Sequence, residues 1–434
     1  MIVNGRIPRV YVFEPSSDEK RKHVASIHAG KKSERKDLSE IKSQLREVRL
    51  RNRELLDKNV ERFKEVLTEN SFFKLHFAQD AKTFLGLLRK STDKTKVVSL
   101  NKSNVLINEV RPFLRRYGYR SFVRYFSEFN DFTPEKKFFT DYWMLPGLHE
   151  KNLIETFGLK SIIDLSIPKN GKDYVTVLGV NAASAKTGNL YFLQHMSNIT
   201  KDLEEAKTIF VLVPLEKIVE YDGDAKLHVQ SMGIFGLESV ILDLKPKREE
   251  VFEFERIPFS DGKKEVHIVI FDNGRKRLLS TAYSDLLLCI DCRACARQCP
   301  VGQHIKSVKE LVYSPKNLLF LYLIGRRKPF EFCLHCGRCE VECPVGIPIP
   351  ELLWKSQIDY SQKKGRSIFK VMFDNPELFA KVGTLLSPVS NWLLEIPIVR
   401  TLISIIPGIH AKAKLPKFSR TTFREWYEER KKRG

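Results

Sequence analysis

The eight cysteines of this sequence lie in one stretch and repeat a single spacing, C-x2-C-x2-C-x3-C-P. The two sets, each followed by a proline, are Cys289, Cys292, Cys295, Cys299 and Pro300, then Cys333, Cys336, Cys339, Cys343 and Pro344. Three thiolates at this spacing can bind three irons of a cubic cluster from one tight loop, while the fourth binds a neighbouring cluster. The pattern therefore predicts two 4Fe-4S clusters.

The expected ligation is crossed between the two sets. The ligands of the first cluster would be Cys289, Cys292, Cys295 and Cys343, and those of the second Cys333, Cys336, Cys339 and Cys299. A disulfide framework is the first alternative, but it is typical of short secreted chains, whereas this one has 434 residues and no apolar signal segment after Met1. Structural zinc is the second alternative, but zinc sites usually use separated cysteine pairs.

The sequence is strongly basic, with a formal net charge of +21. Such a charge is typical of proteins that meet nucleic acid, an anionic membrane face or an acidic partner. Several cations crowd the cysteine sets: Arg293, Arg297, Lys306, Lys309, Arg326, Arg327, Lys328 and Arg338. Positive charge near a cluster favours its reduced state and raises its potential. The alternative is that these side chains simply face solvent.

Upstream of the cysteines, short apolar runs alternate with helical patterns over residues 71 to 280, which predicts an α/β domain. The expected strands are Lys96 to Leu100, Tyr119 to Phe126, Tyr174 to Val180, Leu190 to Gln194, Ile209 to Val213, Ser239 to Leu242 and Val266 to Phe271. The expected helices include Ala78 to Arg89, Asn104 to Arg115 and Leu148 to Phe157. Because the run from Ile209 to Val213 is wholly apolar, we expect a mainly parallel sheet that helices cover on both faces.

Three further regions flank this domain. Residues 1 to 70 should form an irregular or partly ordered arm and, from Leu38, an amphipathic helix. The charged stretch 244 to 265 should be a linker before the last strand. Residues 281 to 362 should form a mainly helical two-cluster ferredoxin domain, because apolar residues recur at helical spacing from Ile305 to Leu323. Residues 363 to 434 should be a helical C-terminal extension with a basic tail.

The C-terminal extension carries many apolar residues but no run long enough to span a membrane. Its most apolar part, residues 382 to 409, is interrupted by Glu395, Arg400 and three prolines. We expect a cytoplasmic protein. The extension would then contact the inner face of the membrane as a peripheral surface, or pack against a partner subunit or the cluster domain.

A string of small residues, GVNAASAKTG at residues 179 to 188, is a weak candidate ligand site in the α/β domain. Small side chains let a backbone approach a ligand closely, and polar groups among them could hydrogen-bond it. The candidate cofactor-binding residues are Gly179, Asn181, Ser184, Thr187 and Gly188. The stretch has no phosphate-loop or dinucleotide fingerprint. A tight connection that needs little side-chain volume is the alternative.

From about Leu55 onward, the order of these elements resembles the lactate-utilisation iron-sulfur protein family of the LutB type. The matching stretches are LDKNVERFKEVL at Leu56, HFAQDA at His76, LPGLH ending at His149, GVNAASAKTGNL at Gly179, EVHIVIFDNGR at Glu265, CIDCRACARQCPV at Cys289, CLHCGRCEVECPVGIPIPELL at Cys333 and the terminal FREWY. Cysteine runs occur in many electron carriers, so the flanking stretches make the resemblance specific.

The resemblance implies a lactate-utilisation (LUD) domain of the NagB/RpiA/CoA-transferase-like fold, followed by the ferredoxin domain. It also implies a subunit of a system that oxidises L-lactate or a related 2-hydroxy acid to the 2-oxo acid. The implied companions are a CCG-repeat protein and a second LUD-domain protein or a flavin-dependent dehydrogenase, so any flavin would lie on a partner. Two positions depart from the family pattern. Lys186 replaces an acidic residue, and Tyr142-Trp143 replaces a His-Ile pair upstream of Pro146 and His149.

The sequence thus predicts an iron-sulfur electron-transfer subunit of a hydroxy-acid oxidising complex. No catalytic residue can be assigned, because no nucleophile triad, carboxylate pair or flavin fingerprint is recognisable. An electron relay in a heterodisulfide-reductase-like or glycolate-oxidase-like assembly is the first alternative. The second is a ligand-binding or nucleic-acid-binding scaffold with structural clusters, although nucleic acid is not the expected partner.

Overall fold

A computed structural model describes residues 7–13, 36–93, 96–123, 174–194, 199–236, 251–258, 263–297, 299–302, 313–365, 371, 374–405, 410, 412–415 and 417–433. The contacts within the chain divide it into two compact units, Met1–Ser356 and Gln357–Gly434. In the described part, no helix is both long enough and apolar enough to cross a membrane. The finer division into arm, LUD domain, cluster domain and extension stays a prediction.

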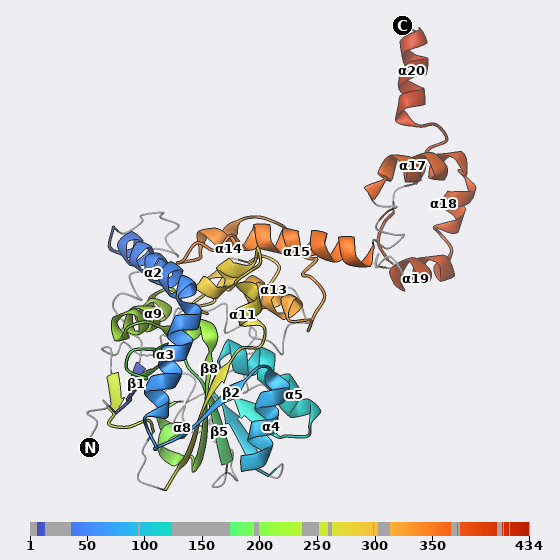
Figure 1. Ribbon diagram of the computed structural model, residues 1–434. Helices are drawn as coiled ribbons and strands as arrows, with labels where there is room; N and C mark the ends of the chain where they lie inside the picture. Colours follow the sequence, from blue (N-terminus) through green and yellow to red (C-terminus); the bar gives the residue numbers. More distant parts are fainter. Residues whose placement is uncertain are drawn as a thin grey trace, which may run out of the picture. The chain divides into compact units, whose positions relative to one another are not determined.

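A six-stranded, wholly parallel sheet forms the centre of the first unit (Figure 1). In spatial order its strands are β2 (Lys74–Ala78), β11 (Glu265–Phe271), β8 (Thr208–Pro214), β5 (Tyr174–Gly179), β3 (Val97–Leu100) and β4 (Ser121–Val123). The predicted α/β class and parallel sheet are therefore confirmed. The strand β2 was not anticipated, because its sequence KLHFA alternates only weakly.

The two faces of this sheet pack into different cores. On β8, Ile209, Val211 and Val213 belong to one buried cluster, while Phe210 and Leu212 belong to another. The first core includes the apolar face of α3 (Leu56–Thr68), and the second includes α4 (Ala81–Ser91) and α5 (Arg111–Arg116) with the π-helical turn Val105–Val110 before it. An apolar strand buried on both faces is the arrangement that a covered parallel sheet requires.

A smaller, mixed sheet lies in the same unit. Its strands in order are β10 (Val251–Phe254), β1 (Val10–Phe13), β7 (Leu190–Leu193), β6 (Ala182–Ser184) and β9 (Ile218–Val219), and α9 (Asp222–Phe235) packs against it. The expectation of a plain linker at 244 to 265 is wrong, because β10 lies in it, and β1 is an ordered part of the arm that was expected to be irregular or partly ordered. Both strands are four residues long, and their backbone pairing partners are remote in sequence, so no local pattern revealed them.

One further expected element is present, and three expected segments cannot be compared with the described residues. The amphipathic helix expected from Leu38 is present as α2 (Lys36–Glu54) and α3, with the break at Leu55. The expected strand from Ser239 to Leu242, the helix from Leu148 to Phe157 and residues 124–126 lie outside the described residues.

The cysteine region shares the first core of the α/β part. It contains the helical segments η5 (Ser284–Leu288), α12 (Ala294–Arg297), α13 (Pro315–Leu323), α14 (Arg338–Val341) and the start of α15 (Ile349–Lys364). Leu288, Leu319 and Ile347 are completely buried in the cluster that also holds the β8 side chains. The predicted helical character is confirmed for residues 315–323, whereas residues 303–312 lie outside the described part.

The second unit is helical where it is described. Its helices are α17 (Pro376–Leu385), α18 (Val389–Leu393), α19 (Pro397–Ile405) and α20 (Phe423–Arg433). Prolines at the starts of α17 and α19 and just before α18 suit positions whose backbone N–H groups have no partner within the helix. The expectation of short apolar helices followed by a basic tail is confirmed, and the tail itself is helical.

Candidate iron-sulfur site

The two cysteine loops, which begin at Cys289 and Cys333, repeat the same backbone conformations. Two residues after the first cysteine of each loop, Asp291 and His335 adopt left-handed conformations with φ of 63° and 50°. Four residues after it, Arg293 and Gly337 do the same, with φ of 61° and 77°. The short helices α12 and α14 then begin at equivalent positions. Repeated left-handed residues outside glycine are uncommon, so the loops are tightly constrained around their thiols.

Backbone N–H groups point at the thiols of both loops. Asp291 N donates to Cys289 Sγ at 3.2 Å, and His335 N donates to Cys333 Sγ at 3.4 Å. At the end of the second loop, Ile347 N donates to Cys343 Sγ at 3.4 Å. Such donors stabilise a thiolate and any cluster that it binds, because hydrogen bonds to the sulfurs help to set the potential.

Thiols of the two loops lie close enough to influence one another. Burial raises the pKa of Cys292, and the neighbouring Cys289 and Cys343 raise it further. Cys295 behaves alike, with burial followed by Cys289, Cys292 and Cys343 raising its pKa. Cys343 of the second loop therefore influences thiols of the first loop, as Cys339 also does at Cys295, and the crossed ligand sets stay a prediction.

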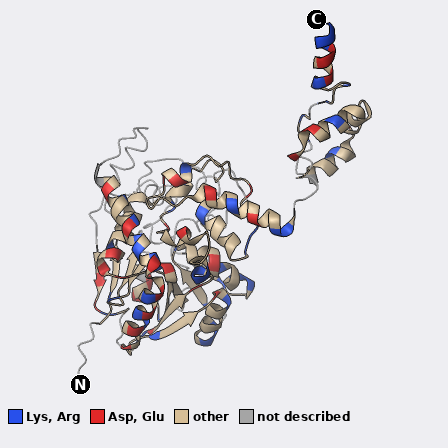
Figure 2. Ribbon diagram, turned by 45° about the horizontal axis from the view of Figure 1, so that its top comes forward, with Lys and Arg blue, Asp and Glu red and all other residues tan. Residues whose placement is uncertain are grey.

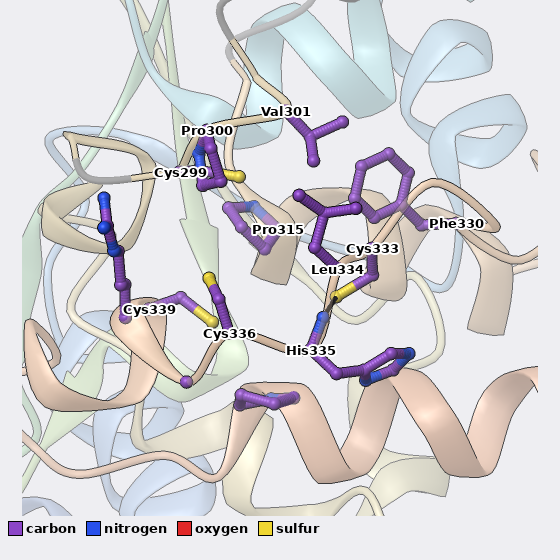
Figure 3. A pocket seen from close by; sticks show the side chains of 13 residues that line it. Cys299, Pro300, Val301, Pro315, Phe330, Cys333, Leu334, His335, Cys336 and Cys339 are labelled. Carbon is purple, nitrogen blue, oxygen red and sulfur yellow. Dashed lines mark hydrogen bonds between the residues drawn. The ribbon is translucent and has the colours of Figure 1, made fainter.

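Cys299 of the first loop likewise influences the second loop. Burial raises the pKa of Cys339 to about 12, and Cys333, Cys299 and Cys336 act in the same direction. Figure 3 shows the sulfur-bearing side chains of Cys299, Cys333, Cys336 and Cys339 around one pocket. Cys336 is the exposed member of this group.

The donor set consists of thiols, which are the usual ligands of iron-sulfur clusters. All eight cysteines are free, and within the described residues no three or more His, Cys, Asp or Glu side chains converge on a point where one metal ion would sit. A cubane carries its thiolates on separate irons, so four thiols around a pocket suit it better than a single-ion geometry.

Buried charges surround the first loop. Asp291 lies between Lys217 Nζ at 2.8 Å and Lys316 Nζ at 3.0 Å. Lys217 ends the turn η4 (Leu215–Lys217) that follows β8, and Lys316 lies in the first turn of α13. Burial alone would raise the pKa of Asp291, but the two ammonium groups hold it well below its usual value. An ionised triad therefore lies directly beside Cys289.

A buried arginine ties the N-terminal helix α2 to this loop. Arg49 donates from Nε to Leu288 O at 3.1 Å, and from Nη2 to Leu287 O at 2.6 Å and Glu216 O at 2.7 Å. One helical turn earlier, Arg46 donates to Val345 O and, at 3.1 Å, to Gly346 O beyond the second loop. The helix α2 thus contacts the chain next to both cysteine sets.

The arginines and lysines that were expected near the cysteines contact different groups. Arg293 Nε donates to Tyr313 O at 3.0 Å, Arg297 pairs with Glu342, and Arg326 lies 3.7 Å from the centre of the Phe113 ring. Lys306 and Lys309 lie outside the described residues. The closest cations to Cys289, Lys316 and Lys217, were missed, because Lys217 is remote in sequence and Lys316 belongs to an otherwise apolar helix.

The small-residue stretch is occupied by contacts within the protein. Ser184, Thr187, Asn189 and Tyr191 all donate to the carboxylate of Asp222 at the start of α9, with Thr187 at 2.9 Å and Asn189 at 2.7 Å. Burial opposes the charge of Asp222, yet the four hydrogen bonds hold its pKa below the usual value. No local sequence pattern marks Asp222 as their common partner.

The glycines and Asn181 of this stretch are similarly engaged. Gly179 N donates to Asn101 Oδ1 at 2.9 Å, and a Cβ at Gly179 would lie 2.5 Å from Ser103 Oγ. Gly188 has a φ of 71°, and Asn181 Oδ1 accepts from Leu193 N at 2.7 Å. These contacts favour the tight-connection alternative, and ligand binding here stays a prediction. Pro146 and His149 lie outside the described residues.

The α/β core with its paired four-thiol loops defines an iron-sulfur protein with a dicluster domain, and comparison with known proteins supports this class. A domain family described as "4Fe-4S dicluster domain" matches residues 285–347. No solved structure matches the chain.

The chain is also similar to proteins named lactate utilization protein B. It is 30% identical to the protein of Bacillus pumilus (strain SAFR-032) over an alignment of 277 residues. This alignment covers 59% of this chain and 56% of the relative. It is 28% identical over 281 residues to that of Bacillus cytotoxicus, covering 60% and 57%. The chain therefore spans little more than half the length of these relatives. Together the relatives and the domain match fit a LutB-type family, as the sequence resemblance predicted.

Proposed function

We propose that this protein is an iron-sulfur electron-transfer subunit of a system that oxidises L-lactate or a related 2-hydroxy acid to the 2-oxo acid. The observation that carries the proposal is the pair of four-thiol groups that share a core with the α/β part. The relatives named for lactate utilization supply the substrate class. The partners would be a CCG-repeat protein and a second LUD-domain protein or a flavin dehydrogenase, and the system would work in the cytoplasm.

The proposed ligands are those of the crossed arrangement. Cys289, Cys292, Cys295 and Cys343 would hold one 4Fe-4S cluster, and Cys333, Cys336, Cys339 and Cys299 the other. When bound, the clusters would supply one-electron transfer. The chain's own part is to hold the thiols, exclude water and set the charge around them, as cofactor-binding proteins do.

The two loops offer different surroundings for this task. The first loop is lined by Asp291, Lys217 and Lys316 and lies against the sheet core, whereas the second loop has the exposed Cys336. Exposure makes the second loop the natural point of exchange with a partner, because transfer requires close approach of two redox centres. The cluster held mainly by the first loop would then be the internal electron carrier.

Anaerobic purification from the native cell tests the proposal. Bound partners and any flavin would be identified, and a panel of 2-hydroxy acids would be offered to the complex. We expect L-lactate or a close relative to bleach the cluster absorbance, with about eight irons per chain. A heterodisulfide-reductase-like or glycolate-oxidase-like assembly would show a different partner set and substrate.

The scaffold alternative makes the opposite prediction. Its clusters would stay in one oxidation state at physiological potentials, and nucleic acid would bind with steep salt dependence. Spectra that remain unchanged with every hydroxy acid and partner, together with such binding, would exclude the electron-transfer function.

A further inference from the structure

The second unit exposes apolar side chains on consecutive helices. On α17, Leu378, Val382 and Leu385 follow the i, i+4, i+7 spacing of one helix face, and Leu385 is 82% exposed. On α18 and α19, Trp392 and Ile398 are 63% and 73% exposed. Exposed large apolar side chains that recur on consecutive helices are typical of an interaction surface.

Among the described residues of this unit, internal packing centres on other side chains than these. Phe418 is one of them, and its ring lies 5.7 Å from that of Phe379. The Asn391 side chain hydrogen-bonds both polar backbone groups of Phe418. Its Oδ1 accepts from Phe418 N at 2.7 Å, and its Nδ2 donates to Phe418 O at 2.9 Å. A Cβ at Gly383 would lie 2.2 Å from the Phe418 ring, so α17 presents its small residue to the interior. The apolar side chains listed above thus point away from the Phe418 contacts of this unit.

The charge of the unit is strongly positive. Residues 357–434 contain 15 Lys and Arg against 7 Asp and Glu. Two of the acidic side chains are neutralised within the unit, since Glu377 pairs with Lys381 and Arg424 and Glu395 pairs with Lys417. The last turn of α20 carries four consecutive basic residues (Figure 2). The surface therefore complements an anionic one.

We propose that the second unit binds the surface of an anionic lipid bilayer. The apolar faces of α17, α18 and α19 would enter the headgroup boundary, and the basic residues of α20 would meet lipid phosphates. The three helices have 10, 5 and 9 residues, so they are too short to cross and suit lying in the plane. Trp392 and Trp426 suit the interface, where tryptophan is enriched.

A bilayer suits this surface better than an acidic protein does. A protein partner needs a complementary groove for the apolar side chains of each helix, whereas lipid adapts to several short helices at once. This proposal goes beyond electron transfer and does not depend on it, because vesicle binding can be measured whether or not the clusters turn over.

Flotation of the full chain, with its clusters loaded anaerobically, tests the proposal. The probes are vesicles of phosphatidylglycerol and phosphatidylcholine, and vesicles of phosphatidylcholine alone. We expect binding to the first kind only, weakened by high salt. The variants Leu385→Glu and Trp392→Glu should each lower binding by about tenfold or more. Val251→Glu, at a half-exposed strand position of the first unit, is the matched control and should bind like the wild type.

A second variant separates charge from folding. Replacing Arg430, Lys431 and Lys432 with Gln changes only exposed positions of α20 and should lower binding to anionic vesicles by about tenfold or more. The proposal is overturned if the wild type ignores anionic vesicles, binds neutral ones equally, or loses as much binding in Val251→Glu as in Leu385→Glu. Loss of a co-purified protein in Leu385→Glu, without vesicle binding by the wild type, would make this face a protein interface instead.

Discussion

Asp291, Lys217 and Lys316 place opposite charges next to Cys289, deep in the fold. Removing a positive charge beside a cluster disfavours its more negative reduced state, and removing a negative charge favours it. The triad therefore offers two substitutions with opposite expected effects on one group. A purely structural role for the triad would not give opposite signs.

We predict that Lys316→Met lowers the midpoint potential of the first cluster and that Asp291→Asn raises it. Each shift should be on the order of 59 mV, a tenfold change for a one-electron couple. Asn tolerates the left-handed conformation at position 291, so the loop should persist. Potentiometric titration followed by electron paramagnetic resonance measures both shifts, and Lys64→Met on α3 serves as the surface control. Shifts of the same sign would rule out this electrostatic account.

Crossed ligation is tested by the fourth cysteine of each set. Cys343→Ser should perturb the cluster held mainly by Cys289, Cys292 and Cys295, and Cys299→Ser should perturb the other one. Iron content and the resonance spectrum of each variant report which cluster is lost. If each substitution damages only the cluster of its own loop, the ligand sets are not crossed.

At this scale the sequence predicted the thiols and missed their surroundings. The cysteine spacing is local, so it is readable directly. Lys217 and Arg49 reach Asp291 and Leu288 only after the sheet and α2 have packed, and no local pattern encodes such contacts.

At the scale of the elements, Asp222 links the start of α9 to the β6–β7 hairpin by hydrogen bonds. Its carboxylate accepts from Ser184, Thr187, Asn189 and Tyr191, and a carboxylate in the first turn also suits the helix dipole. The small residues of the hairpin connection allow this close approach. The stretch that looked like a ligand loop thus has a structural role in the described fold.

We predict that Asp222→Asn lowers the free energy of unfolding by about 1–3 kcal/mol at neutral pH, because its donors lose a charged acceptor. Since the folded-state pKa of Asp222 is depressed, its contribution is present above the unfolded pKa near 4 and is lost as pH falls through the folded value. Denaturant titrations should therefore show the deficit shrinking below about pH 4. Asp57→Asn, at an exposed ion pair with Lys276, should change little. A deficit independent of pH would contradict this account.

The helix α2 should govern assembly of the cluster loops. Arg49→Met removes three hydrogen bonds to buried carbonyls and should cost about 2–4 kcal/mol, with reduced iron retention. Thermal unfolding and iron analysis measure the two effects, and Lys58→Met on the exposed side of α3 is the control. Full iron content and unchanged stability in Arg49→Met would show that α2 is dispensable.

Elements with long, strongly patterned sequences were predictable, and short paired ones were not. The strand β8 and the helix α3 have apolar patterns that fix their burial. The strands β1 and β10 are four residues each and depend on one another and on β7, so their existence follows from tertiary pairing.

For the whole molecule, the order of an α/β part, a cysteine module and a helical C-terminal unit followed from the sequence. The sequence did not predict that these parts share one continuous hydrophobic core. Leu288, Ile347 and Leu353 join the β8 side chains in one buried cluster, which periodicity alone cannot reveal. This continuity couples the cysteine loops to the sheet and makes the α/β part a structural neighbour of the first cysteine loop.

The most direct test is electron paramagnetic resonance of the anaerobically prepared full chain, frozen after mixing with L-lactate and its co-purified partners. The account predicts signals of reduced 4Fe-4S clusters that grow with lactate and vanish when the partners or the substrate are omitted. Clusters that dithionite reduces but that lactate with partners leaves silent would contradict it.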